Sequence, residues 1–203
     1  MRDGSARVFS DSAQGLLSVR FSPNGQYIVA GNSGGVLMMW NVRTGHLLDK
    51  WSGHQCAVLN VAFTPDGKGL VSGSGDGAVK YWDVSLPGLF QSDGGSATTE
   101  ILEYKGHVVR LVPSFNPCST VIIGPVLSPQ SVVKCVAISP DARWIASASC
   151  DKTVILWETC SAVRQRTLVG HEDVVVSVDF SPAGTYLAVG SRDGHSTIWR
   201  YFR

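Results

Sequence analysis

The sequence predicts an all-β fold in which four copies of one small antiparallel sheet pack around a common axis, as in a β-propeller. The first observation is a repeated motif, apolar-x-apolar-Ser/Thr-Pro, which occurs at residues 19–23, 61–65, 136–140 and 178–182. The second is a tryptophan seventeen residues after each proline, at Trp40, Trp82, Trp157 and Trp199. Four equal spacings indicate four copies of one structural unit.

The second copy shows the strand pattern most clearly. Residues 58–63 alternate as a strand does, and Pro65-Asp66-Gly67 forms a turn. Residues 69–72 pair back onto the first strand, and residues 78–82 form a third strand. Residues 101–104 are expected to form the fourth strand. A sheet of this kind is apolar on both faces, so it must stack against its neighbours.

Both ends of the chain fit the same register. Val8 and Phe9 lie where an outermost strand belongs, whereas Trp199-Arg200-Tyr201 ends a third strand with no fourth strand after it. We therefore expect the N-terminal strand to complete the last sheet.

Composition excludes several classes of protein. The chain has 203 residues, of which 44% are hydrophobic and 16% charged, so it is not a disordered segment. The net charge of +1 gives no electrostatic attraction for nucleic acid. No apolar run reaches the roughly 18 residues of a membrane helix. We expect no membrane and no direct nucleic-acid partner.

The five cysteines, at 56, 118, 135, 150 and 160, are odd in number and lack metal-ligand spacing. They predict neither a disulfide framework nor a metal site, and no cofactor is expected. A reducing compartment, the nucleus or the cytoplasm, is therefore the expected location.

Further short motifs recur at fixed positions in the repeat. Gly-His precedes three of the units, at His54, His107 and His171. Trp40 and Trp82 are 42 residues apart, and so are Trp157 and Trp199. Trp82 is followed by Asp, Trp40 by Asn and Trp157 by Glu. This combination resembles the WD40 repeat family. The resemblance implies one WD40-type β-propeller domain over residues 1–203, with four recognisable blades at about 6–42, 53–83, 106–158 and 170–200. Because WD40 rings usually have seven blades, the ring is expected to be partial or open.

The resemblance also implies a structural network of buried polar side chains. An aspartate stands six residues before three of the tryptophans, and a histidine and a strand serine accompany it. The expected sets are His54, Ser72 (or Ser74), Asp76 and Trp82; His107, Ser147 (or Ser149), Asp151 and Trp157; and His171, Ser191, Asp193 and Trp199. The first unit lacks this network, because Ser12 and Gly34 replace its histidine and aspartate.

A histidine, an aspartate and a serine also suggest a hydrolase triad. A triad needs one exposed, activated serine beside an oxyanion hole, whereas this trio recurs in three equivalent places without a Gly-x-Ser-x-Gly elbow. The structural interpretation is favoured. We expect no catalytic residues and no enzyme activity.

Two insertions separate the second and third units. Residues 85–99 are rich in glycine and serine and predict a loop between a third and a fourth strand. Residues 109–130 contain four prolines and an apolar patch, Val121-Ile122-Ile123. This second segment is either a binding loop or a translated, unspliced intron of 66 nucleotides. The intron hypothesis is favoured.

Within the WD40 family, residues 53–203 resemble the late blades of fungal Groucho/TUP-type transcriptional co-repressors. The resemblance implies a non-catalytic protein-interaction scaffold that binds DNA-bound repressors or histone tails. The expected partner-binding rim consists of loop residues near the polar network: Gln55, Gly75, Cys150, Lys152, Glu172, Asp173 and Arg192. The alternatives are a generic adaptor, such as a ubiquitin-ligase substrate receptor or a signalling scaffold, and a truncated fragment without function.

Overall fold

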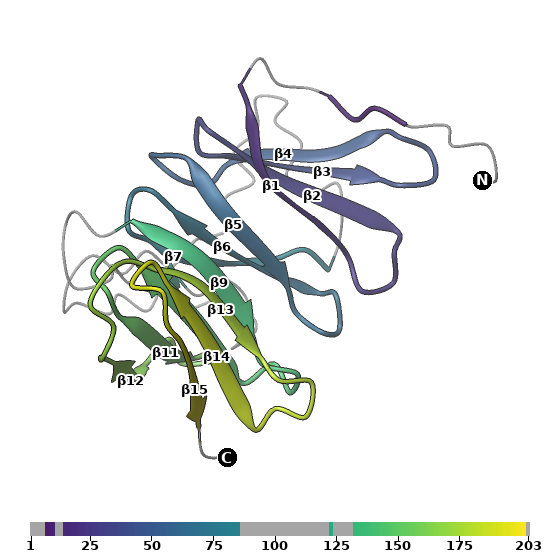
Figure 1. Ribbon diagram of the computed structural model, residues 1–203. Coiled ribbons are helices and arrows are strands. Elements are labelled where there is room, and N and C mark those ends of the chain that lie inside the picture. Colours follow the sequence, from purple (N-terminus) through teal and green to yellow (C-terminus); the bar gives the residue numbers. More distant parts are fainter. Residues whose placement is uncertain (1–6, 11–13, 86–121, 124–131, 202–203) are drawn as a thin grey trace.

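The computed structural model describes residues 7–10, 14–85, 122–123 and 132–201, and these residues form four antiparallel sheets (Figure 1). They contain strands and turns but no helix, so the described part of the chain has no helix that could cross a membrane. The all-β prediction is confirmed.

The first sheet contains four strands in chain order, with β1 innermost and β4 outermost. The strands are β1 (Leu16–Phe21), β2 (Tyr27–Asn32), β3 (Val36–Asn41) and β4 (Leu47–Ser52). The hairpins between them turn at Gly25, Gly35 and Gly45, where φ is +69°, +83° and +79°. Glycine adopts these left-handed conformations without a steric penalty, so each turn ends a strand sharply.

The second sheet follows the predicted strand order, with β5 (Val58–Phe63), β6 (Gly69–Ser74) and β7 (Val79–Asp83). Its fourth strand differs from the prediction. Residues 101–104 lie outside the described residues, and the edge of β7 pairs instead with β8 (Ile122–Ile123). Two β-branched residues of the predicted insertion thus supply the backbone hydrogen bonds that the edge of β7 requires.

The third sheet has four strands, β9 (Val133–Ile138), β10 (Trp144–Ser149), β11 (Val154–Glu158) and β12 (Arg164–Leu168). The last sheet has three, β13 (Val175–Phe180), β14 (Tyr186–Ser191) and β15 (Ser196–Arg200).

The N-terminal segment does not complete the last sheet, so that prediction is wrong for the described residues. Val8 and Phe9 form no strand, and the ring of Phe9 packs against Trp40 of the first sheet at 6.2 Å between ring centroids. The reason is visible in Figure 1, where β1 and β15 belong to the sheets at opposite ends of the stack. An open stack keeps the first segment away from β15.

The motif Ser/Thr-Pro recurs because its hydroxyl closes the hairpin between the first and second strands. The Thr64 hydroxyl donates to Asp66 and accepts the N–H of Gly69 at 2.8 Å. The Ser139 hydroxyl repeats this arrangement with Asp141 and with the N–H of Trp144. Such side-chain to backbone bonds fix the turn before the second strand begins.

The four sheets stack face to face in chain order through their innermost strands. β5 lies between β1 and β9, and β13 lies against β9 (Figure 1). Three apolar clusters fill the three spaces between neighbouring sheets. The described residues therefore form an open arc, which is a partial β-propeller.

Candidate functional site

The polar network of the second sheet joins four buried or half-buried side chains. The indole N–H of Trp82 donates to Ser72 Oγ at 2.8 Å, and Ser72 Oγ lies 2.7 Å from Nε2 of His54. Nδ1 of His54 lies 3.1 Å from Asp76 Oδ2. A neutral imidazole with its proton on Nδ1 satisfies every bond, because Ser72 then donates to Nε2 and His54 donates to the carboxylate.

Burial determines the charge of this network. Removal from water lowers the pKa of His54 below its ordinary value, although the hydrogen bond and the negative charge of Asp76 oppose the shift. Burial alone would raise the pKa of Asp76, but hydrogen bonds from His54 and from the N–H groups of Gln55 and Ala78 hold it well below its usual range. At neutral pH the pair is therefore a neutral imidazole and a carboxylate.

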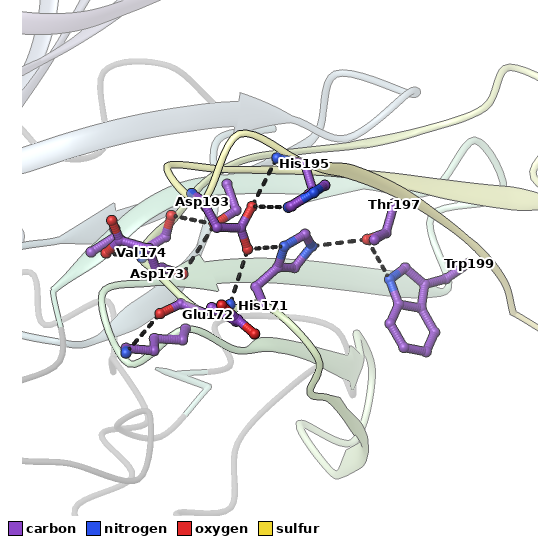
Figure 2. A network of polar contacts seen from close by, with 10 residues as sticks. His171, Glu172, Asp173, Val174, Asp193, His195, Thr197 and Trp199 are labelled. Carbon is purple, nitrogen blue, oxygen red and sulfur yellow. Dashed lines mark hydrogen bonds and ion pairs between the residues drawn. The ribbon is translucent and has the colours of Figure 1, made fainter.

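The last sheet holds a second complete network (Figure 2). His171 Nδ1 lies 2.8 Å from Asp193 Oδ2, and His171 Nε2 lies 2.9 Å from the hydroxyl of Thr197. The indole N–H of Trp199 donates to the same hydroxyl at 2.9 Å. The expectation that Ser191 supplies this hydroxyl is wrong, because Thr197 supplies it.

Strand register explains why Thr197, and not a residue of the second strand, supplies the hydroxyl. Ser72 of β6 is directly opposite Lys80 of β7, and the corresponding pair in the last sheet is Val189 and Thr197. Directly opposed side chains on one face of a sheet are close neighbours, so a hydroxyl from either strand reaches the same point. In the last sheet it comes from the third strand instead of the second.

Ser191 has a different role, which Ser74 and Ser149 share in part. The Ser191 hydroxyl donates to the carbonyls of Asp173 and Val174 and accepts the N–H of Asp193. Ser74 and Ser149 accept the N–H of Asp76 and Asp151 in the same way. These serines hold the turn that carries the network aspartate.

The third sheet contains part of the network among the described residues. Trp157 donates its indole N–H to Ser147 at 2.9 Å. Asp151 accepts from the N–H and the hydroxyl of Thr153, and His107 lies outside the described residues. In the first sheet the opposed positions hold Ala30 and Met38, so neither strand offers a hydroxyl.

The predicted rim residues lie in two sets of loops at one edge of the arc. Gln55, Glu172 and Asp173 precede the first strand of a sheet, and Gly75, Cys150, Lys152 and Arg192 lie in the turn between the second and third strands. The side chains of five of them are exposed: Gln55, Lys152, Glu172, Asp173 and Arg192. Gly75 and Cys150 are half-buried.

Backbone hydrogen bonds join these two sets of loops to the network. The N–H groups of Gln55 and Glu172 donate to Asp76 and Asp193, each at 3.0 Å. The N–H of Arg192 donates to the carbonyl of Val174 at 2.9 Å. The network thus fixes the backbone from which the exposed rim side chains project, a relation that sequence spacing alone does not reveal.

Lys152 connects two neighbouring sheets at this rim. Its ammonium group donates to the carbonyl of Glu172 at 2.8 Å, and its φ is +71°. The equivalent turn positions in the other sheets are Gly35, Gly77 and Gly194, all with positive φ. A lysine in a left-handed turn is strained, and strained backbone of this kind is common at functional sites.

The geometry of the network in the second sheet does not suit nucleophilic catalysis. Ser72 is fully buried and His54 is 5% exposed, so a substrate cannot reach the hydroxyl. The described residues contain no group of three or more histidine, cysteine, aspartate or glutamate side chains arranged to hold a metal ion. The arrangement is suited to fixing loops instead.

Stacked antiparallel sheets of three or four strands, two of them with a complete His–Asp–hydroxyl–Trp network, are typical of a propeller-type repeat protein. The profile of the WD40 family (WD domain, G-beta repeat) matches residues 3–41, 45–83, 117–158 and 162–200. The matches cover well over half of the sequence, and the chain belongs to the WD40 repeat family.

Individual relatives match with low identity or over short segments. The transcriptional repressor rco-1 of Neurospora crassa is 37% identical over 79 residues, which is 36% of this chain and 13% of that protein. The transcription initiation factor TFIID subunit 5 of Caenorhabditis elegans is 35% identical over 71 residues, or 35% and 11% of the two chains. The nuclear distribution protein PAC1-2 of Uncinocarpus reesii is 28% identical over 206 residues, or 97% and 39%. The matched segments span well under half of each of these relatives.

Proposed function

We propose that this chain is a non-catalytic scaffold of the transcriptional co-repressor kind, which binds histone tails or DNA-bound repressors through its rim. The observation that carries the proposal is the rim itself, where exposed side chains project from loops that the buried networks hold in place. A fixed loop loses little conformational freedom when it binds a partner, so more of the contact energy appears as affinity. The similarity to rco-1 and to TFIID subunit 5 supports a nuclear role.

The loop before β13 carries two acidic side chains that favour a basic peptide, whereas the neighbouring rim residues Lys152 and Arg192 are basic. Glu172 and Asp173 are exposed neighbours in the loop before β13. Complementary charge increases the rate of association and excludes wrong partners. Histone tails are a partner with this chemistry.

The test is fluorescence polarisation with labelled histone-tail peptides. Glu172→Lys is expected to weaken binding by about tenfold or more, because it replaces a complementary charge with a repulsive one. Glu158→Lys, at the opposite end of β11 from Lys152, is the matched control and should bind as the wild type does. Equal binding by both variants would show that the loop before β13 is not the binding site, and a wild-type chain that does not bind these peptides would exclude histone tails as the partner.

The second candidate is a general adaptor, because the WD40 family match does not specify a partner. Affinity capture from cell extract separates the two. Recovery of repressors and histones supports the co-repressor role, whereas recovery of ubiquitin-ligase subunits or signalling enzymes supports the adaptor. A chain that captures neither and unfolds at physiological temperature would be a fragment without function.

A further inference from the structure

Each end of the arc exposes an apolar sheet face. On β1, Val19 is 51% exposed and Phe21 is 62% exposed. On the last sheet, Tyr186 is 47% exposed and Ile198 is 74% exposed, and both line a hollow with Ala188. Exposed apolar surfaces of this kind mark sites of association.

The face of the first sheet carries a Val-x-Phe pair that is packed at two of the three contacts between sheets, and at the third contact β9 carries Val136 and Ile138. Val61 and Phe63 occupy the positions in β5 that Val19 and Phe21 occupy in β1. They lie in one apolar cluster with three side chains of the preceding sheet, Tyr27, Val29 and Met39. In β13, Val178 and Phe180 repeat this packing against Trp144, Ala146 and Leu156.

The face of the last sheet carries the complementary set. By strand position, Tyr186, Ala188 and Ile198 correspond to Tyr27, Val29 and Met39. The chain therefore exposes one Val-x-Phe surface and one surface of the kind on which Val-x-Phe packs. These two faces complement each other but lie at opposite ends of the arc (Figure 1).

The N-terminal segment adds an independent observation. Phe9 packs on Trp40 with ring centroids 6.2 Å apart and an interplanar angle of 62°. Trp51 of β4 packs on Trp82 of the next sheet in the same way, with ring centroids 5.9 Å apart and an interplanar angle of 63°. Trp51 and Trp82 each lie 42 positions after their counterparts Phe9 and Trp40. Residues 7–10 thus occupy the place of a fourth strand from a preceding sheet, whereas the last sheet has only three strands in the described residues.

We propose that two copies of this chain associate head to tail, so that the last sheet of each copy packs against the first sheet of the other. Residues 7–10 of each copy then lie beside β15 of its partner, in the position of a fourth strand. Two four-sheet arcs make a closed ring of eight sheets, within the range of about four to eight that propellers adopt.

A second copy suits both faces because each chain offers one face of each kind. The contact is heterologous, and its repetition by a two-fold axis covers all four exposed faces in one ring. It also buries Phe21 in an environment that the chain already builds twice around a phenylalanine, at Phe63 and at Phe180.

Sedimentation velocity on the full chain measures this association directly. The expected mass is twice the 21.7 kDa of one chain. Phe21→Glu and Ile198→Glu each place a carboxylate in the contact and should weaken the dimer roughly 100-fold or more. Both side chains are exposed in the single arc, so each variant should keep the wild-type tryptophan fluorescence.

Mixing the two variants gives the decisive measurement. The Phe21→Glu chain keeps an intact last face and the Ile198→Glu chain keeps an intact first face, so the mixture should form a heterodimer through one wild-type contact. Val169→Glu, at a residue 66% exposed outside both faces, is the matched control and should remain a dimer.

Three outcomes would overturn the proposal. A wild-type chain that remains monomeric leaves the faces to further sheets or to another protein. A mass that increases without limit with concentration indicates an open filament. An Ile198→Glu variant that remains a dimer indicates contact between two copies of the first face.

Discussion

The hydroxyl between histidine and tryptophan is the residue on which each network depends. In the second sheet it comes from Ser72 of β6, and in the last sheet from Thr197 of β15. In both it accepts the indole N–H and contacts Nε2 of the histidine. The network therefore requires a hydroxyl at one point in space, and either of two opposed strand positions can provide it.

This equivalence predicts the result of moving the hydroxyl across the last sheet. Thr197→Val should destabilise the chain by about 1–3 kcal/mol, because His171 and Trp199 both lose a partner in a partly buried site. Adding Val189→Ser should restore a large part of this loss. Urea unfolding followed by tryptophan fluorescence measures both, and a double variant less stable than Thr197→Val would contradict the account.

The charge state of the second network predicts how stability depends on pH. The folded-state pKa of His54 is below the 6.5 of the unfolded chain, so the unfolded chain binds more protons as the pH falls below 6.5. Stability should be complete above this pH and decrease below it. The lowered pKa of Asp76 adds stability that is present above its ordinary value of 3.8 and is lost at lower pH.

Unfolding free energies at pH 7.5 and 5.5 check this expectation. His54→Gln should be less stable at pH 7.5 and should lose part of the decrease between the two values. His46→Gln, which changes an exposed histidine in the turn before β4, is the control. Identical pH dependence in the wild type and in both variants would show that His54 is not buried in neutral form.

Sequence reasoning located the network carboxylates but not every hydroxyl. Asp76 and Asp193 are fixed by a turn of constant length before a tryptophan, so counting residues finds them. The role of Thr197 was not predicted, because counting residues along one strand cannot show which of two opposed strands supplies the hydroxyl. The signal was present in the pair Val189 and Thr197, where only the second residue carries a hydroxyl.

At the scale of the sheet, small residues on the second strand permit close stacking. A β-carbon at Gly73 would lie 2.7 Å from a methyl carbon of Val133 and 2.9 Å from one of Val136 in the next sheet. Gly190 has the same strand position in the last sheet, but its nearest neighbour would be Ser177 at 3.6 Å. The same substitution at these two positions thus distinguishes its effect on the stacking of sheets from its effect on the folding of a single sheet.

We predict that Gly73→Val destabilises the chain by about 3 kcal/mol or more, because the added side chain overlaps the adjacent sheet. Gly190→Val should cost much less in a single arc. Both are compared by thermal unfolding in an Ile198→Glu background, which prevents the association proposed above. Similar losses at the two positions would argue that the sheets do not stack as described.

The fourth strand of the second sheet was the element that the sequence could not place. Fourth strands carry neither the Ser/Thr-Pro motif nor the tryptophan, so their assignment depended on position alone. The structure pairs β8 (Ile122–Ile123) with β7, inside the segment that we interpret as an intron. The intron hypothesis remains a prediction.

A chain without residues 109–130 tests that hypothesis at the protein level. If residues 101–104 can take the place of β8, the shortened chain should unfold at the same or a slightly higher temperature, because a shorter connection changes the closure entropy by less than about 1 kcal/mol. Differential scanning calorimetry gives the comparison. A midpoint lower by several degrees would show that the segment is a genuine part of the sheet.

At the scale of the whole molecule, the stacking of sheets governs both proposals. Stacking brings the rim loops of neighbouring sheets together, as Lys152 and Glu172 show, and it leaves one unpaired face at each end. The repeat predicted the order of the sheets but not the position of residues 7–10. The position of residues 7–10 depends on whether the arc closes into a ring. Closure is a property of the assembled sheets and not of any one motif.

Nuclear Overhauser effects between neighbouring sheets test this stacking most directly. Gly31 on β2 faces Val58 on β5, and Gly73 on β6 faces Val133 on β9, so each glycine Hα should give a cross-peak to the methyl groups of its valine. Cross-peaks confined to residues within single sheets, with none between these two pairs, would contradict the account.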